Sequence, residues 1–246
     1  MATNPEVSKN QSSTSPLTVI MPAYNEEGAI RSAVEEVKNE VLDKVPGATL
    51  LVVNDGSKDK TASILDELAR HDPRISVIHQ VNRGHGPSLI TAMHNASGKC
   101  IFQIDSDMQI PLNCFSQLWK TMDSADAIFG VRSQRHDPPH RLFVSALIAF
   151  ILGIMFKVDL PDSNAPFKIF KKDIWEELQA KLGGETIVAP SIFLAIYAKK
   201  HNYKVMEVSV EHKARATGDP SLNLVSLARC AINGFSQIIQ YKDQLS

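Results

Sequence analysis

The sequence predicts an α/β protein whose core is a mostly parallel β-sheet flanked by helices. In the first half of the chain, short runs of consecutive apolar residues alternate with segments that carry apolar residues at helical spacing. Runs that are apolar on every position are typical of strands buried on both faces. The helical segments between them are about 10–15 residues long, which is the spacing of βαβ units.

Each element of the first half follows from a local pattern. Strands are expected in the apolar runs at 17–21, 49–53, 75–79 and 100–104, and the first run is closed by Pro22. Helices are expected over 29–41, through 64–68 and near 88–96. Asp59 is placed to cap the second of these helices.

The second half is less regular. Strands are expected over 126–131, 167–170 and 205–210, and helices over 112–122, 142–156 and 222–241. No linker-like stretch separates the two halves, so we expect residues 17–246 to form a single domain. Residues 1–16 are polar, with no apolar core of a signal peptide, and we expect them to be a disordered leader.

Composition excludes several classes of protein. The 246 residues include 26 Lys and Arg against 27 Asp and Glu, for a net charge of −1, and 43% of them are hydrophobic. A disordered tail, a collagen-like repeat and a strongly basic nucleic-acid binder are excluded. Three widely spaced cysteines make no disulfide framework, which favours the reducing cytoplasm. The apolar stretch 142–156 is shorter than the roughly 20 residues that span a membrane, and is either a core helix or a helix on a membrane surface.

Three polar clusters follow predicted strands, where open α/β sheets bind ligands. They are Pro22–Glu27, Asn54–Ser57 and Asp105–Gln109. Either of the first two alone is compatible with an ordinary turn. In the third, Asp105 and Asp107 repel each other unless a cation lies between them. Carboxylate oxygens suit Mg²⁺ or Mn²⁺, which can also bind a diphosphate.

The order of these clusters resembles the family 2 glycosyltransferases of the GT-A fold. The segments that carry the resemblance are PAYNEE, VVNDGSKDKT and VNRGHGPSLITAMHNASGKCIFQIDSDMQ, and it extends roughly over residues 17 to 222. It is strongest for the polyprenyl-phosphate sugar transferases, the dolichyl-phosphate mannosyltransferase-like branch, whose DADLQ motif is similar to DSDMQ. The resemblance implies a Rossmann-like sheet, with a nucleotide-sugar half at 17–109 and an acceptor half at 110–246.

The resemblance also implies roles for individual residues. Those expected around the nucleotide sugar are Pro22, Tyr24, Glu26, Val53, Asp55, Asp105 and Ser106. Among them, Asp55 would accept a hydrogen bond from the base or the ribose. The metal ion would be bound by Asp107 and Gln109 with help from Asp105. We interpret His85, in the turn Arg83–Gly86, as structural.

The acceptor site is expected in the second half. Its implied phosphate-binding residues are Arg132, Arg141, Ser145 and Arg215. Arg141 and Ser145 are four residues apart and share one face of the predicted helix 142–156. Guanidinium groups from three separate segments suit a phosphate. Catalysis is expected to depend on Asp107, Arg132 and Arg215.

Two segments depart from the pattern of the branch. Gly218–Leu222 lacks the lysine of the usual Gly-x-Ser-Lys motif, and Asn164–Lys168 replaces Ser-Gly-Phe-Arg, with Lys168 preserving the positive charge. A hydroxyl acceptor would require a carboxylate base, for which Asp162 and Glu185 are the candidates. A phosphate acceptor is already an anion and needs none.

These observations predict a metal-dependent inverting glycosyltransferase that moves a hexose from a GDP- or UDP-sugar to a polyprenyl phosphate. It would act in the cytoplasm, at the cytoplasmic face of the membrane if helix 142–156 makes peripheral contact. A charge at Ile148 or Leu152 is then expected to weaken membrane binding. The alternatives are transfer to a hydroxyl acceptor and a non-catalytic module that binds nucleotide sugar.

Overall fold

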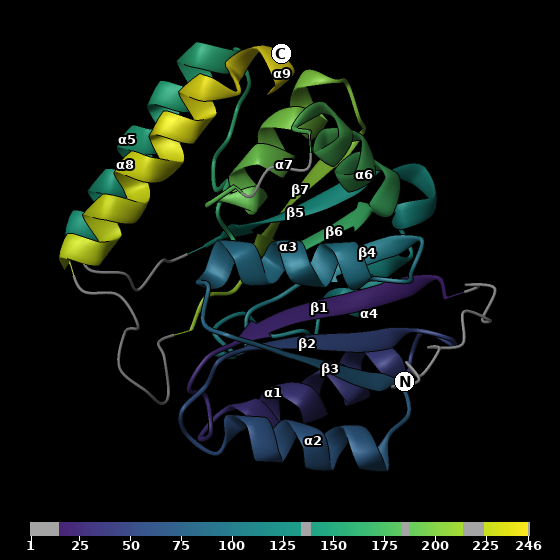
Figure 1. Ribbon diagram of the computed structural model, residues 1–246. Coiled ribbons are helices and arrows are strands. Elements are labelled where there is room, and N and C mark those ends of the chain that lie inside the picture. Colours follow the sequence, from purple (N-terminus) through teal and green to yellow (C-terminus); the bar gives the residue numbers. More distant parts are fainter. Residues whose placement is uncertain (1–14, 134–138, 184–186, 214–223, 246) are drawn as a thin grey trace, which may run out of the picture.

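The computed structural model of the protein describes residues 15–133, 139–183, 187–213 and 224–245. Its strands form one mixed sheet in the order β3-β2-β1-β4-β6-β5-β7 (Figure 1). The strands are β1 (Leu17–Ala23), β2 (Thr49–Asp55), β3 (Ile75–Gln80), β4 (Cys100–Gln103), β5 (Ala127–Arg132), β6 (Lys168–Lys171) and β7 (Val205–Val210). Neighbouring strands are parallel except β6, which is antiparallel to β4 and β5. The predicted mostly parallel sheet is therefore confirmed.

Helices cover both faces of the sheet. They are α1 (Ile30–Val37), α2 (Thr61–His71), α3 (His85–Asn95), α4 (Phe115–Trp119), α5 (Pro139–Phe156), α6 (Lys172–Lys181), α7 (Pro190–Lys200), α8 (Leu224–Gln240) and α9 (Lys242–Leu245). Adjacent residues of β1 belong to different core clusters, because successive side chains of a strand point to opposite faces. Val19 belongs to the cluster that includes residues of α1, α2 and α4, whereas Ile20 belongs to the cluster that includes residues of α3, α5, α6, α7 and α8.

The sequence prediction places most strands within two residues of their observed ends. Pro22 does not close the first strand, which continues to Ala23. Pairing of β1 with β4 stops at Ile20 and Gln103, while pairing with β2 continues through Pro22. The missing N–H of Pro22 therefore lies beyond the end of the β4 ladder, where proline is tolerated.

The helices are predicted less well than the strands. The helix expected over 29–41 is α1 followed by a π-helical turn at Lys38–Leu42, and the one expected over 112–122 is limited to α4 and a short 3₁₀ turn. The prediction lacks α6 and α7. Eight of the eleven residues of α7 are buried, so this helix has no polar face and no amphipathic period to detect.

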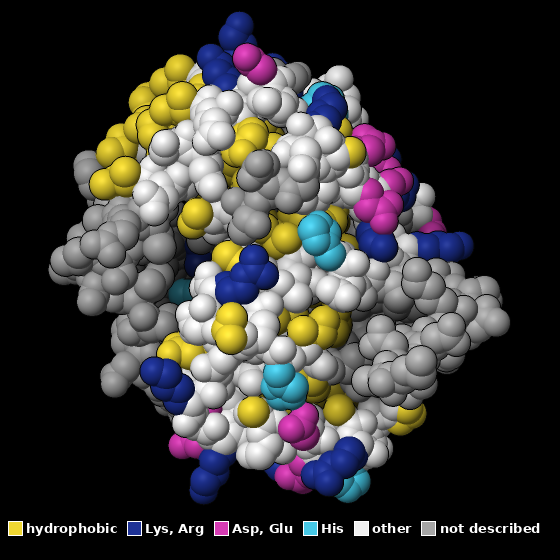
Figure 2. Space-filling model, in the orientation of Figure 1, with side chains coloured by type: hydrophobic (Ala, Val, Ile, Leu, Met, Phe, Trp, Pro, Cys, Tyr) yellow, Lys and Arg dark blue, Asp and Glu magenta, His cyan; other side chains and the backbone are white. Residues whose placement is uncertain are grey.

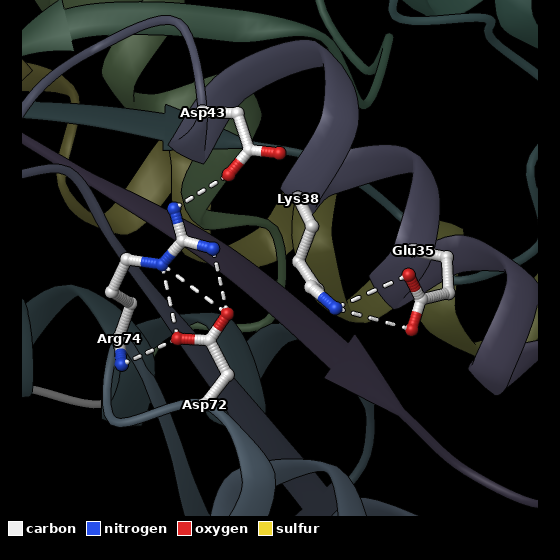
Figure 3. A network of polar contacts seen from close by, with 5 residues as sticks. All are labelled: Glu35, Lys38, Asp43, Asp72 and Arg74. Carbon is white, nitrogen blue, oxygen red and sulfur yellow. Dashed lines mark hydrogen bonds and ion pairs between the residues drawn. The ribbon is translucent and has the colours of Figure 1, made fainter.

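An ion-pair network fixes the turn before β3 (Figure 3). Because β1, β2, β3 and β4 are parallel, this turn lies at the opposite end of the strands from the polar clusters. Arg74 Nη2 lies 2.7 Å from Asp72 Oδ2, and Arg74 Nη1 lies 2.7 Å from Asp43 Oδ1. The Arg74 guanidinium holds the pKa of Asp72 below its ordinary value. The network joins the loop after α1 to the start of β3.

Helices α5 and α8 combine a buried face with exposed apolar side chains. Leu152, Phe156 and Ile238 belong to the core cluster on the α3 face of the sheet. Among the side chains that the structure describes on these two helices, five large apolar ones are at least 46% exposed: Leu147, Phe150, Ile154, Ile232 and Ile239. Apolar side chains gather at the upper left of Figure 2, where Figure 1 places α5 and α8. Among the described residues, no helix is both long and apolar enough to cross a bilayer.

Candidate active site

The three polar clusters meet at one edge of the sheet. They follow β1, β2 and β4, which are neighbouring parallel strands, so their carboxyl ends lie together. This arrangement is the usual ligand site of an open α/β sheet. The strand-end reasoning from the sequence is confirmed for the positions of the clusters.

The loops after β1 and β2 are locked together by reciprocal hydrogen bonds. The N–H of Asn25 donates to Ser57 Oγ (3.0 Å), and the N–H of Lys58 donates to Asn25 Oδ1 (2.8 Å). The N–H of Glu26 donates to Thr61 Oγ1 (2.8 Å) at the start of α2. Asn25 adopts a positive φ of 53°, a conformation that asparagine tolerates better than most residues. These bonds fix the two loops relative to each other.

Asp55, at the end of β2, is 3% exposed and accepts hydrogen bonds from the loop before α3. Its Oδ1 accepts from the Arg83 N–H (2.9 Å) and from Gln80 Nε2 (2.7 Å), and its Oδ2 accepts from the Gly84 N–H (2.8 Å). The carboxylate that we expected to contact the nucleoside therefore also fixes the position of the 83–84 loop.

A glycine makes the approach of this loop possible. Gly56 has a φ of +70°, and a Cβ at this position would lie 2.6 Å from the backbone nitrogen of Asn82. Any side chain at position 56 would push the 82–84 loop away from Asp55. Gly56 is thus required for the loop after β3 to pack against the end of β2.

Asp105 and Asp107 follow β4 on either side of Ser106, which is 5% exposed. Asp105 Oδ1 is buried and has no hydrogen-bond partner among the described residues. His85 Nε2 lies 3.8 Å from this oxygen. Burial raises the pKa of Asp105, His85 opposes the increase, and Asp107 adds to it. Asp107 Oδ1 accepts from the Gln109 N–H at 3.2 Å.

The carboxylates fit a divalent cation that brings some of its own ligands. Within the described ranges, no group of three or more His, Cys, Asp and Glu side chains could hold a metal ion. An unpartnered buried carboxylate oxygen is nevertheless a costly feature unless a cation satisfies it. Mg²⁺ is typically bound by one or two carboxylates together with water and substrate phosphates. Asp105 and Asp107 match this pattern.

Gln109 connects the carboxylate segment to the second half of the chain. Its side-chain Nε2 donates to the Lys213 carbonyl (3.1 Å), and the Lys213 N–H donates to the Gln109 carbonyl (2.8 Å). The segment after β7 is therefore held against the segment after β4. Arg215 follows two residues later and lies outside the described residues, as does Glu185.

Arg132, at the end of β5, pairs with Asp162. Its Nε and Nη2 lie 2.7 Å and 2.8 Å from the two carboxylate oxygens, and its backbone N–H donates to Oδ2 at 3.1 Å. The two side chains are 11% and 4% exposed. The residue expected to contact the acceptor phosphate and one candidate base thus bind each other.

The fully buried Lys168 lies on β6, opposite Gln103 of β4. Its Nζ donates to the Ala165 carbonyl and lies 5.6 Å from the centre of the Phe129 ring. Burial lowers the pKa of Lys168 to about 7, against the attraction of Asp162. Lys168, which replaces the arginine of the related motif, is therefore buried inside the protein.

The remaining site predictions fall into two groups. Val53 is fully buried in the core, and Pro22 is buried in β1, whereas Tyr24 and Glu26 are partly exposed. Ser145 lies on α5 and is partly exposed, while the side chain of Arg141 on the same helix lies outside the described part of the structure. The residues expected around the nucleotide sugar thus lie at or near the ends of β1, β2 and β4. Of the expected acceptor residues, the structure describes the side chains of Arg132 and Ser145.

Sequence reasoning missed two contributions to this edge. The sequence indicates no contact for His85 or Gln80 at this edge. In the structure His85 Nε2 lies 3.8 Å from Asp105 Oδ1, and Gln80 Nε2 donates to Asp55 Oδ1 from the end of β3. The Gly-His-Gly pattern at 84–86 is the signal that could have identified His85, since glycines on both sides allow a close approach.

Comparison with known proteins agrees with this geometry. Residues 18–206 match the model of the family described as glycosyl transferase family 2. The chain is 30% identical over 168 residues to the uncharacterized glycosyltransferase YkcC of Bacillus subtilis, covering 66% of this chain and 51% of that protein. It is 23% identical over 214 residues to undecaprenyl-phosphate 4-deoxy-4-formamido-L-arabinose transferase of Pseudomonas aeruginosa, covering 86% of this chain and 61% of that protein. The chain thus spans about half to two thirds of the length of these relatives.

Solved structures share the fold. Glucosyl-3-phosphoglycerate synthase from Mycobacterium tuberculosis, in complex with Mn²⁺, UDP-glucose and phosphoglyceric acid, superposes with a TM-score of 0.70. The match covers 92% of this chain and 79% of that one, at 16% sequence identity. With the polar clusters after β1, β2 and β4 and a family match over most of its length, this chain belongs to glycosyl transferase family 2.

Proposed function

We propose that this chain catalyses the metal-dependent, inverting transfer of a hexose from a nucleotide diphosphate sugar to a polyprenyl phosphate. The observation that carries the proposal is the pair of carboxylates Asp105 and Asp107. Asp105 Oδ1 is buried without a hydrogen-bond partner among the described residues, and the pair lies beside the interlocked loops after β1 and β2. This site combines a place for a cation with preformed loops for a nucleotide.

Asp107 and Gln109 would hold the Mg²⁺ or Mn²⁺ ion with help from Asp105. Gln109 Nε2 also donates to the Lys213 carbonyl, which fixes the side chain. When bound, the ion would neutralise the charge that develops on the leaving diphosphate. The Mn²⁺ and UDP in the structural neighbour support this assignment. His85 lies at the same edge of the sheet and would add positive charge when protonated.

The nucleoside would contact the loops that Asp55 organises. Tyr24 and Glu26 are partly exposed at the end of β1, and Asp55 holds the 83–84 loop against the end of β2. Because these loops are already fixed by hydrogen bonds, binding would cost little further ordering of the chain.

For the acceptor, we propose a phosphate oxygen as the nucleophile. It would form the new bond to the anomeric carbon as the bond from that carbon to the diphosphate breaks, and the nucleoside diphosphate would leave. The name of the Pseudomonas aeruginosa relative, an undecaprenyl-phosphate transferase, supports this acceptor class. Asp162 supports it too, because its carboxylate accepts three hydrogen bonds from Arg132. A carboxylate in that state is a weak base. Arg132, Arg141, Ser145 and Arg215 remain the proposed phosphate contacts.

We also propose that α5 and α8 lie on an anionic membrane surface. Leu147, Phe150 and Ile154 are spaced along one face of α5 and are 46%, 66% and 64% exposed. Neither helix contains an acidic residue, although the chain has 27. A helix with exposed apolar side chains and no negative charge is suited to the interface of an anionic bilayer.

The structure changes which residues can test this contact. Leu152 is fully buried and Ile148 packs against the core, so a charge at either position would disrupt the fold instead of the surface. Phe150→Asp is the appropriate variant, and it should abolish flotation with vesicles that contain phosphatidylglycerol. Val81→Asp is the matched control, because Val81 is 80% exposed and lies after β3, outside both helices. It should float like the wild type, and unchanged flotation of Phe150→Asp would contradict the contact.

Transfer can be tested directly. The protein is incubated with radiolabelled UDP-glucose or GDP-mannose, Mn²⁺ and undecaprenyl phosphate, and the lipid is extracted into butanol. Label should enter the lipid, should require the metal, and should not enter undecaprenol. Transfer to undecaprenol would favour a hydroxyl acceptor. Nucleotide binding without transfer to either lipid would indicate a non-catalytic binding module.

A further inference from the structure

Helix α8 packs against a short segment of the chain, Ile187–Ala189. Gln237 Oε1 accepts a hydrogen bond from the Val188 N–H at 2.7 Å. Gly234, one turn earlier, packs under Ala189, since a Cβ built on it would lie 3.8 Å from Ala189 Cβ. The same face of α8 thus holds two consecutive residues of this segment.

The other side of the segment packs against the first turn of α3. A Cβ on Gly86 would lie 2.0 Å from the Val188 carbonyl oxygen and 2.7 Å from its carbon. Position 86 therefore admits no side chain while Val188 keeps its place. Ile187 is fully buried beside it. Val188 is the point where α8 and α3 meet the same backbone.

The start of α3 also contacts two carboxylates of the proposed nucleotide-sugar site. The Gly84 N–H donates to Asp55 Oδ2, and His85 Nε2 lies 3.8 Å from Asp105 Oδ1. A displacement of Val188 would be transmitted to Gly86 by direct contact, and so to the residues that precede it. Packed interiors transmit such displacements because they contain little free space.

The outer face of α8 is apolar and exposed. Ile232 and Ile239 are 69% and 51% exposed and lie two turns apart on one side of the helix. Gln237 and Gly234 lie on the opposite side, at about 100° per residue around the helix axis. Contact of the outer face with a lipid surface would therefore hold in place the helix whose inner face contacts Val188 and Ala189.

We propose that Gln237 is a positioning residue that couples contact between α8 and an anionic lipid surface to nucleotide binding, through Val188 and Gly86. This proposal rests on the proposed function, because it requires both the membrane contact and the nucleotide site. Breaking the bond would remove the hydrogen-bond acceptor of the Val188 N–H and would weaken the contact that links α8 to α3.

The test compares nucleotide binding with and without vesicles. Dissociation constants for UDP and GDP are measured with Mn²⁺, in buffer and with vesicles of phosphatidylcholine and phosphatidylglycerol. The wild type should bind one nucleotide more tightly with vesicles, by about 5-fold or more, the lower range of typical coupling between sites. Gln237→Met should lose this difference, and Gln237→Glu, which keeps an acceptor oxygen, should retain it.

A matched control lies on the same helix. Gln240 is exposed, so Gln240→Met should respond to vesicles like the wild type. An equal vesicle response in Gln237→Met and the wild type would overturn the coupling while leaving the proposed function intact. A wild type that binds nucleotide but not vesicles would overturn the membrane contact and the coupling with it. A wild type that binds no nucleotide would overturn the proposed function itself.

Hydrogen exchange gives a second measurement that needs no variant. The Val188 amide should exchange more slowly in the wild type when vesicles are added, because contact with the lipid would hold α8 in place. Control amides in α2, such as that of Leu65, should exchange at an unchanged rate. Equal exchange at Val188 with vesicles bound would overturn the proposal.

Discussion

The two halves of the chain position their polar residues by different means. In the first half, side chains at strand ends bond directly to the backbone of a neighbouring loop, as Asp55 does with Arg83 and Gly84. In the second half, the central polar contact is an ion pair between the side chains of Arg132 and Asp162, which are 11% and 4% exposed. The first arrangement joins loops at the ends of neighbouring parallel strands, whereas the second joins the end of β5 to the segment before the antiparallel strand β6.

The largest effect is expected at the carboxylates after β4. Asp107→Asn should reduce sugar transfer by about 100-fold or more while the protein stays folded, because a metal ion stabilises the leaving group by several kcal/mol. Transfer and thermal unfolding are both measured. Asp123→Asn, at an exposed position in the 3₁₀ turn after α4, is the control and should transfer normally. Full activity of Asp107→Asn, or of the wild type in EDTA, would contradict the metal assignment.

The second prediction compares the ion pairs of the two halves. Asp162→Asn should lower the free energy of unfolding by about 3 kcal/mol, because it removes the charge that offsets a buried guanidinium. Asp72→Asn, in the more exposed pair with Arg74, should cost about 1 kcal/mol or less. Urea unfolding measures both. Equal losses would mean that burial does not distinguish the two pairs.

Asp162→Asn also separates the acceptor hypotheses, provided that activity is compared per folded molecule. Because Arg132 already occupies both carboxylate oxygens, we expect the folded variant to retain most transfer to undecaprenyl phosphate. Loss of transfer in a variant that is fully folded and binds nucleotide normally would favour a base at Asp162 and a hydroxyl acceptor.

The difference between the halves also explains what the sequence can predict. The clusters after β1, β2 and β4 could be placed together because parallel neighbouring strands share an edge. The pairing of Arg132 with Asp162 could not, since it depends on how β5 and the loop before β6 approach each other. The sequence indicates only that Lys168 preserves the positive charge of a related motif. Its burial follows from the position of β6 between β4 and β5, which the sequence does not predict.

The third prediction separates the two faces of α5. Leu152→Ala should lower the free energy of unfolding by about 2–5 kcal/mol, because Leu152 is fully buried and the change leaves a cavity. Phe150→Ala, two positions earlier and 66% exposed, should change it by about 0.5 kcal/mol or less. Chemical denaturation of both variants is the measurement. A large loss for Phe150→Ala would mean that its ring packs against part of the protein and not against lipid.

A small effect is expected at the surface network of the first half, and its size depends on pH. Arg74 lowers the pKa of Asp72, so their attraction stabilises the fold above the ordinary carboxyl pKa of about 3.9 and is lost as the pH falls through the lower folded value. Arg74→Ala should therefore destabilise the protein by about 0.5–1 kcal/mol at pH 7, where solvent screens the partly exposed pair. The difference from the wild type should shrink as the pH is lowered from about 5 toward about 2. Arg31→Ala, which removes a pair that is about half exposed on both sides, should have a smaller effect at every pH. A difference between Arg74→Ala and the wild type that persists at the acid end of this range would show that the Arg74 side chain stabilises the turn by packing instead of charge. The comparison with the buried Arg132–Asp162 pair would then no longer compare two ion pairs.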